Sequence, residues 1–136
     1  GLMCRKTSTK QESFSKMAAT SHSVDFGVIN EELEGFFGKY TPGLSTESIM
    51  TTLCCIVAKH AKNYNFVGFY CTKTVNDVKV LEVGPYQSEM LACGRIDFGS
   101  GVVGRCAELK ETRIENDVTK CDNYIACDLE TKSEIC

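Results

Sequence analysis

The sequence predicts an α+β domain in which two helices precede an antiparallel sheet. Apolar residues recur at three- and four-residue steps over residues 25–60, which is the period of a helix buried along one face. Short runs rich in β-branched and aromatic residues follow over residues 65–96. The connections between these runs are too short for crossover helices, so we expect an antiparallel meander.

The first helix is expected over residues 25–40, and the Thr-Pro-Gly sequence that follows ends it. Its apolar stripe consists of Phe26, Ile29, Leu33, Phe36, Phe37 and Tyr40. Ser45 can cap a second helix, because its hydroxyl can accept from a free backbone N–H group of the first turn. Glu47 then lies in that first turn, where a negative charge is favourable.

Three strands are expected next, at residues 65–72, 78–84 and 91–96, with the sequences VNDV and GPYQSE as the turns between them. A glycine-rich turn then leads into a short helix, and the sequences TRIEN and SEIC each predict a further strand. Gly99 and Gly101 leave a phosphate-binding loop as an alternative, although neither the Lys-Ser/Thr pair of a P-loop nor a dinucleotide fingerprint is present.

The composition argues against two classes of partner. A chain of 136 residues and 15.0 kDa is the size of one domain. Its net charge of -3 gives no basic face for nucleic acid. No apolar run approaches the roughly 20 residues of a membrane-spanning helix. We therefore expect neither nucleic acid nor a membrane as a partner.

Nine cysteines are present, an odd number, and no two have the Cys-x-x-Cys spacing. A disulfide-stapled secreted module and a structural zinc site with His22 and His60 remain as alternatives. We favour cysteines that are reduced and buried as small hydrophobic residues, with Cys54, Cys55 and His60 packing in the second helix. This interpretation predicts a reducing, cytoplasmic compartment and no bound metal.

Residues 1–24 are expected to form a flexible N-terminal tail, and residues 25–136 the folded domain. The tail is rich in Ser and Thr and shows no apolar periodicity. Its charged side chains are mostly basic: Arg5, Lys6, Lys10 and Lys16, with Glu12 as the acid. A mitochondrial transit peptide has a similar composition and is the alternative interpretation.

Five motifs occur in a characteristic order between residues 68 and 136. They are GFY at 68–70, GPYQ at 84–87, LACGRI at 91–96, GSGVVG at 99–104, and IACD followed by SEI around Cys127 and Glu134. In this order they resemble the free methionine-(R)-sulfoxide reductases of the GAF-domain superfamily, over about residues 25–136. The resemblance implies an α+β fold whose central antiparallel sheet carries the N-terminal helices.

The resemblance also implies a thiol chemistry. Cys127 matches the family's nucleophile, whose thiolate attacks the sulfur of methionine sulfoxide and becomes a sulfenic acid. Cys93 matches the resolving cysteine, which would condense with that sulfenic acid to form a disulfide. No cofactor is expected to bind, and an external thioredoxin-like dithiol would reduce the disulfide.

The substrate pocket is expected to combine acids with aromatic faces. Glu134 matches a carboxylate that would hold the substrate's ammonium group, and Asp128 follows the nucleophile directly. Acids so close to a cysteine disfavour its thiolate, so we expect them to serve the substrate. Tyr70 ends the matching GFY, and Phe66 stands where the family usually has Trp. In the alternative interpretation both aromatic residues face the core of the sheet.

Two departures from the family pattern stand out. Val103 replaces a third cysteine that the family commonly has, and either Cys106 or Cys121 could relay electrons in its place. The sequence also stops at Cys136, where a further central strand is expected. Either the chain is incomplete, or a partner such as a second copy supplies the strands, or the product is divergent.

Two noncatalytic functions therefore remain open. GAF domains often serve as small-molecule sensors, so the chain could bind a ligand without turnover. Alternatively, Cys93 and Cys127 could form the switch of a redox-responsive interaction module.

Overall fold

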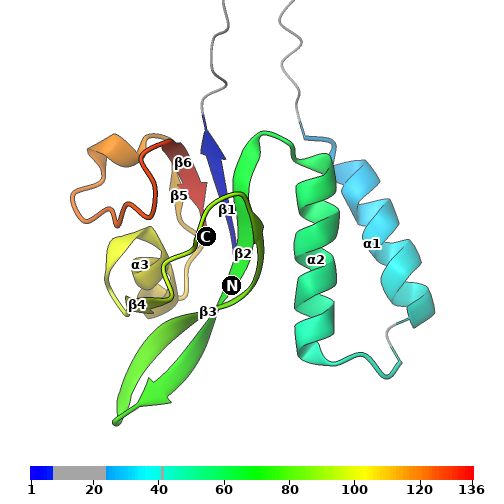
Figure 1. Cartoon of the computed structure of the whole chain (residues 1–136), viewed down its shortest axis with the longest axis horizontal. Helices are drawn as coiled ribbons and strands as arrows, with labels where there is room; N and C mark the ends of the chain where they lie inside the picture. Colours follow the sequence, from blue (N-terminus) through cyan, green and yellow to red (C-terminus); the bar gives the residue numbers. More distant parts are fainter. Residues whose placement is uncertain (8–23, 41) are drawn as a thin grey trace, which may run out of the picture.

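The structure is a computed structural model, and it describes residues 1–7, 24–40 and 42–136 (Figure 1). In these residues six strands form one antiparallel sheet in the order β4-β3-β2-β1-β6-β5. The strands are β1 (Leu2–Thr7), β2 (Tyr64–Val75), β3 (Val78–Ser88), β4 (Arg95–Asp97), β5 (Ile114–Glu115) and β6 (Thr131–Ile135). The predicted α+β class with an antiparallel sheet is confirmed.

Helices lie on both sides of this sheet (Figure 1). The helices α1 (Phe26–Tyr40) and α2 (Thr46–His60) lie together on one side, and α3 (Gly101–Leu109) lies on the other with a short 3-10 helix, η1 (Val118–Lys120), beyond it. The predicted cap of α2 is confirmed, because the Ser45 hydroxyl accepts from the backbone N–H of Ser48 at 3.1 Å. The two predicted helices thus form with the expected boundaries.

The β2–β3 hairpin turns where the sequence predicts it. Asn76 and Asp77 both have positive φ, 49° and 61°, as the two central residues of a hairpin turn matched to strand twist require. The second predicted turn is wrong, because residues 84–88 continue β3 alongside β2. Of the third predicted run, residues 91–96, only the last two lie in a strand, β4, which extends to Asp97, and residues 91–94 form a loop.

The largest correction concerns the N-terminus. The predicted tail is wrong for Leu2–Thr7, which form β1 in the middle of the sheet, between β2 and β6. Met3 and Arg5 of this strand are both buried, and Leu2 and Cys4, on its other face, are partly buried. A central strand of the sheet is thus formed by residues at the start of the sequence. Residues 8–23 of the predicted tail, with His22 of the alternative zinc site, lie outside the described residues.

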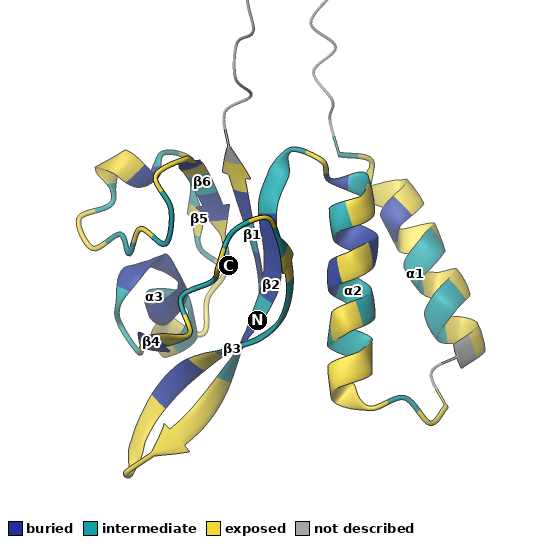
Figure 2. Ribbon diagram, viewed as in Figure 1, coloured by how far each residue is buried: buried dark blue, intermediate teal, exposed yellow. Residues whose placement is uncertain are grey.

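Two apolar clusters lie on opposite faces of the sheet (Figure 2). The cluster beneath α1 and α2 comprises Ile29, Cys54, Ile56, Val57, Ala61 and Val67. The cluster beneath α3 comprises Met3, Phe66, Tyr70, Leu81, Ile96 and Val103. The second cluster contains several of the residues singled out by the resemblance.

The residues assigned to packing in α2 behave differently from one another. Cys54 is completely buried, as predicted, whereas Cys55 is exposed. His60 is not an apolar packing residue, because its Nε2 lies 2.6 Å from a carboxylate oxygen of Glu32.

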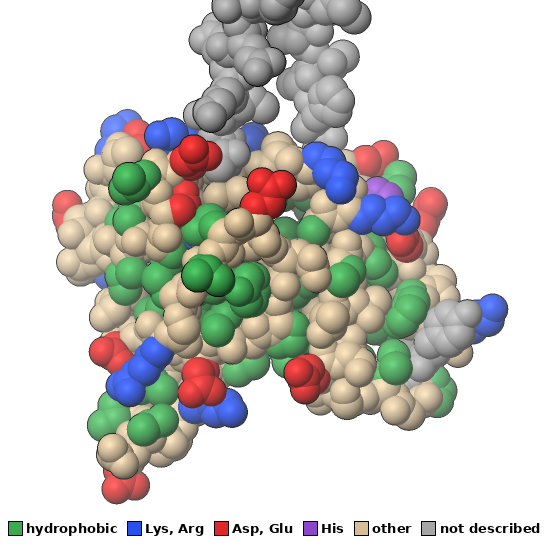
Figure 3. Space-filling model, in the orientation of Figure 1, with side chains coloured by type: hydrophobic (Ala, Val, Ile, Leu, Met, Phe, Trp, Pro, Cys, Tyr) green, Lys and Arg blue, Asp and Glu red, His purple; other side chains and the backbone are tan. Residues whose placement is uncertain are grey.

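None of the described helices is long and apolar enough to cross a membrane. On the face shown in Figure 3, acidic and basic side chains are interspersed.

Candidate functional site

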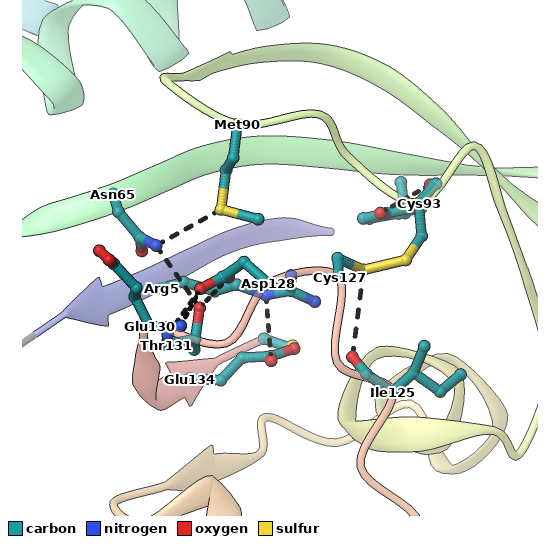
Figure 4. A network of polar contacts seen from close by, with 12 residues as sticks. Arg5, Asn65, Met90, Cys93, Ile125, Cys127, Asp128, Glu130, Thr131 and Glu134 are labelled. Carbon is teal, nitrogen blue, oxygen red and sulfur yellow. Dashed lines mark hydrogen bonds and ion pairs between the residues drawn. A yellow bond between two sulfur atoms is a disulfide. The ribbon is translucent and has the colours of Figure 1, made fainter.

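A disulfide joins Cys93 and Cys127, which lie 34 residues apart in the sequence (Figure 4). Their Cα atoms are 5.8 Å apart. Cys93 belongs to the loop between β3 and β4, and Cys127 to the loop between η1 and β6. The remaining cysteines are free thiols, including the half-buried Cys106 and Cys121. The structure therefore brings together the two cysteines that the resemblance pairs.

Tyr70 holds the loop that carries Cys93. Its hydroxyl donates to the backbone carbonyl of Cys93 at 2.8 Å, and the rest of the side chain is buried in the cluster beneath α3. Val103, at the position of the family's third cysteine, packs in the same cluster. Tyr70 thus contacts the disulfide loop through its hydroxyl and the core through its ring.

Asp128 organises the other loop. One of its oxygens accepts from the backbone N–H groups of Glu130 and Thr131, at 2.6 and 2.7 Å, and the other contacts the Thr131 hydroxyl. Burial acts to raise the pKa of the Asp128 carboxyl, but these hydrogen bonds outweigh it and lower the pKa below its usual value. The carboxylate therefore makes its hydrogen bonds within the turn that leads from Cys127 into β6.

Glu134 is buried and paired with Arg5. The two residues are directly opposite each other in the β1–β6 ladder, and Arg5 Nε donates to Glu134 Oε2 at 3.2 Å. The side chains are only 2% and 1% exposed. Burial raises the pKa of Glu134, and the positive charge of Arg5 opposes that shift. Glu134 therefore binds a cation of the same chain, Arg5, whereas the sequence predicts that it binds the substrate's ammonium group.

The second carboxylate oxygen of Glu134 contacts a thiol. Cys136 Sγ lies 3.4 Å from Glu134 Oε1, in donating geometry. Burial and the neighbouring carboxylate both raise the pKa of Cys136 above its ordinary value. Cys136 therefore stays protonated and can act as the donor in this contact.

Phe66 forms the floor beneath the ion pair. It is completely buried and stacks on Tyr86, with ring centroids 5.5 Å apart and planes inclined by 15°. The guanidinium carbon of Arg5 lies 5.6 Å from the centre of the Phe66 ring. Phe66 and Tyr70 both belong to the core in this oxidised structure, as the alternative interpretation expects.

A narrow internal space lies between the ion pair and α3. Its walls include Arg5, Glu134, Tyr124, Ile125 and the first turn of α3. This space has no room for a water molecule. This space is therefore filled by protein atoms in the disulfide-linked structure.

Sequence reasoning missed two polar residues of the sheet, one of which lines this space. Arg5 was assigned to the tail, because a buried arginine interrupts the apolar alternation that would reveal a strand. Asn65, near the start of β2, was also missed; its amide contacts Met90 Sδ at 3.4 Å and the Thr131 hydroxyl at 3.5 Å (Figure 4). No motif in the sequence marks either contact. No group of three or more metal-ligating side chains occurs among the described residues.

Solved structures resemble this arrangement over most of the chain. A structure described as the GAF domain is 32% identical, with a TM-score of 0.70, and the match covers 90% of this chain and 74% of that one. This chain belongs to the GAF-domain family. The free methionine-R-sulfoxide reductase of Neisseria meningitidis, solved with its substrate, shares the GAF fold at 24% identity and a TM-score of 0.71, over 90% of this chain and 69% of that one.

Curated relatives match part of this GAF chain. The free methionine-R-sulfoxide reductase of Saccharomyces cerevisiae is 48% identical over 75 residues, which cover 55% of this chain and 41% of the relative. Protein YtsP of Bacillus subtilis is 46% identical over 72 residues, which cover 52% of this chain and 42% of the relative. The chain thus spans less than half the length of these two relatives. No family model matches the sequence.

Proposed function

We propose that this GAF domain reduces free methionine-(R)-sulfoxide to methionine by thiol chemistry. The observation that carries the proposal is the Cys93–Cys127 disulfide. The chain's identity to the yeast free methionine-R-sulfoxide reductase supports the same chemistry. A disulfide between loops that are distant in sequence is what a nucleophile and its resolving thiol leave after one turnover.

In the proposed reaction Cys127 is the nucleophile. Its thiolate attacks the sulfoxide sulfur, the oxygen passes to Cys127 as a sulfenic acid after taking up a proton, and methionine leaves. The Cys93 thiol then displaces that oxygen as water and forms the disulfide. An external dithiol of the thioredoxin type reduces the disulfide by exchange. One sulfoxide and two thiols thus give one thioether, one disulfide and one water.

The surrounding residues have proposed roles that fit their positions. Asp128 and Tyr70 hold the two cysteine loops through the contacts described above. Phe66 forms the apolar floor, and Glu134 supplies the acid wall of the space. Because the space beside Glu134 is filled in the disulfide-linked structure, the proposal requires the Cys93 loop to move, once the disulfide is reduced, before substrate can enter. A cytoplasmic location, where the free thiols stay reduced, is part of the proposal.

A steady-state assay tests this function. The 136-residue chain is mixed with free methionine-(R)-sulfoxide, thioredoxin, thioredoxin reductase and NADPH, and NADPH oxidation is followed. We expect turnover that Cys127→Ser abolishes and that Cys55→Ser, at an exposed thiol outside the site, leaves intact. Equal activity of the Cys127→Ser variant and the unmodified protein would contradict the proposal.

One observation favours a second candidate function. The carboxylate of Glu134 is already neutralised by Arg5, and the space beside it is closed. A noncatalytic GAF module could use the Cys93–Cys127 pair as a redox switch or bind a ligand after reduction. Formation of the disulfide under mild oxidants, without any turnover of methionine sulfoxide, would support this candidate.

A further inference from the structure

Two free thiols line one groove on the side of the sheet that α3 covers. The groove has a volume of about 570 Å³ and lies between the β2–β3 hairpin, the C-terminal half of α3 and the end of β6. Cys106 of α3 and Cys136, directly after β6, both line it, and both also line a smaller adjoining space. Cys93 and Cys127 are not among the residues that line these two spaces. The groove is therefore a second place where thiols of this chain meet.

The surroundings of Cys136 bring it close to Cys106 and keep it protonated. Its backbone exchanges hydrogen bonds of 2.9 and 3.0 Å with Arg113, just after the end of α3. Burial raises the pKa of Cys136, and the carboxylate of Glu134 and the nearby Cys106 act in the same direction. Because only a thiolate attacks a disulfide, Cys136 is a poor first nucleophile. Cys106 is thus the thiol of this pair that a reagent in the groove meets first.

The side chains around the groove indicate which reagent fits. Lys79 and Lys110 line it, with Glu111 as the acid among its lining residues, and Leu81 and Phe98 add apolar surface. Its volume lies within the range of small-molecule sites. A small disulfide that carries carboxylates suits two ammonium groups beside a thiol. Oxidised glutathione is a reagent of this class.

We propose that Cys106 and Cys136 are a second redox-active pair, which a small anionic disulfide such as oxidised glutathione oxidises through the groove. First, the Cys106 thiolate attacks one sulfur of the reagent, and one glutathione leaves with the proton that Cys106 released. The Cys136 sulfur then attacks Cys106 Sγ, and its proton passes to the second departing glutathione. One small disulfide and two protein thiols thus give one protein disulfide and two glutathione thiols.

The second step changes the surroundings of Glu134. The Cys136 thiol lies 3.4 Å from Glu134 Oε1, in donating geometry, and a sulfur in a disulfide has no proton to donate. Oxidation therefore removes this contact, while the contact between Arg5 and Glu134 Oε2 remains. The pair links the redox state of the groove to an acid of the candidate site. It does so without Cys93 or Cys127, so the inference does not depend on the proposed function.

The test uses the full chain with Cys93→Ser and Cys127→Ser, so that the first disulfide cannot form. This double variant is reduced, freed of reductant and incubated with oxidised glutathione. Its remaining thiols are then blocked, and the protein is digested with trypsin under nonreducing conditions. The unmodified chain is treated in parallel and should give the same second link.

Trypsin separates the thiols in question. Cys106 falls in the peptide 106–110 and Cys136 in the peptide 133–136. We expect mass spectrometry to find these two peptides joined by a disulfide. A link from either peptide to the one that carries Cys121, or two unmodified thiols, would overturn the inference.

Single substitutions added to the double variant test the order of the two steps. Cys136→Ser should stop after the first step and accumulate glutathione on Cys106. Cys106→Ser should leave Cys136 as a free thiol, because that thiol stays protonated. Cys55→Ser, at an exposed thiol on α2, is the matched control and should still form the link. Glutathione on Cys136 in the Cys106→Ser protein would overturn the role of Cys106 as the first nucleophile.

A second reagent tests the charge of the groove. Cystamine is a small disulfide that carries ammonium groups and no carboxylates. In low-salt buffer, with the rate at Cys55 as reference, we expect Cys106 to react at least about threefold faster with oxidised glutathione than with cystamine. Lys110→Gln should reduce this preference, and Lys62→Gln, at an exposed lysine outside the groove, should not. Equal relative rates for the two reagents would overturn the choice of an anionic disulfide.

Discussion

At the scale of single residues, the two linked cysteines differ in their surroundings. Cys127 lies directly before Asp128, whose carboxylate is fixed by hydrogen bonds to Glu130 and Thr131. Cys93 lies on a loop held by the Tyr70 hydroxyl. The proposed reaction uses the two thiols one after the other. Loss of the Cys127 thiol should therefore have a different effect from loss of the Cys93 thiol.

Cys127→Ser should abolish the first turnover, whereas Cys93→Ser should allow one turnover and then stop. The reason is that the nucleophile acts before the resolving thiol, so the second variant accumulates a sulfenic acid. Dimedone labelling followed by mass spectrometry should find the label on Cys127 in Cys93→Ser. If both variants lose the first turnover equally, the assigned roles do not hold.

Asp128 should give the loop a stability that depends on pH. Its pKa is lowered on folding, so the ionised form stabilises the native state above about pH 4 and that contribution is lost as the pH falls through the lower native value. Asp128→Asn should therefore cost about 2 kcal/mol of unfolding free energy at pH 7, and less at pH 3. Urea titrations at both pH values measure the difference. A cost that does not change between them would show that ionisation of Asp128 is not the cause.

At the scale of elements, β1 makes the sheet continuous. It joins the β2–β3–β4 half to the β6–β5 half, and it supplies Met3 to the cluster beneath α3. Its neighbours on both sides are hydrogen-bonded strands, so its backbone groups are satisfied there. The short segment before residue 8 is thus a core element, although it precedes α1 in the sequence.

Met3→Ala should destabilise the domain by about 3 kcal/mol, because it empties a fully buried position under α3. Lys6→Ala, at an exposed position of the same strand, should change stability by no more than about 0.5 kcal/mol. Chemical denaturation measures both. Similar small effects of the two substitutions would mean that β1 does not contribute to the core.

At the scale of the whole molecule, the disulfide ties the β3–β4 loop to the segment before β6. The cross-link closes a loop with a sequence separation of 34 residues, which includes α3. It therefore restricts the unfolded chain considerably. We expect the oxidised protein to be more stable than the reduced protein and less accessible to substrate.

Oxidation should raise the free energy of unfolding by about 4 kcal/mol, the loop-entropy value for a closure of this length. Denaturant titrations with and without reductant measure the change. The double variant Cys93→Ser/Cys127→Ser serves as control and should respond to reductant much less. An equal response of the control and the unmodified protein would assign the effect to other thiols.

The sequence by itself determined the elements whose signals are local. Apolar periodicity and the Ser45 cap define α1 and α2, and the Asn76–Asp77 pair defines the hairpin turn. The resemblance carried by the motifs around Cys93 and Cys127 also implied the linked pair. The helix, cap and turn signals lie within a few residues of the features that they predict.

Only the tertiary structure decided the place of β1 and the state of Glu134. A run as short as Leu2–Thr7, with Arg5 at an inward position, has no periodicity that distinguishes it from a basic tail. It becomes a central strand because two distant strands satisfy its backbone and Glu134 neutralises its buried charge. A strand of this kind is stabilised by partners in β2 and β6, far along the chain, and no local pattern in the sequence encodes them.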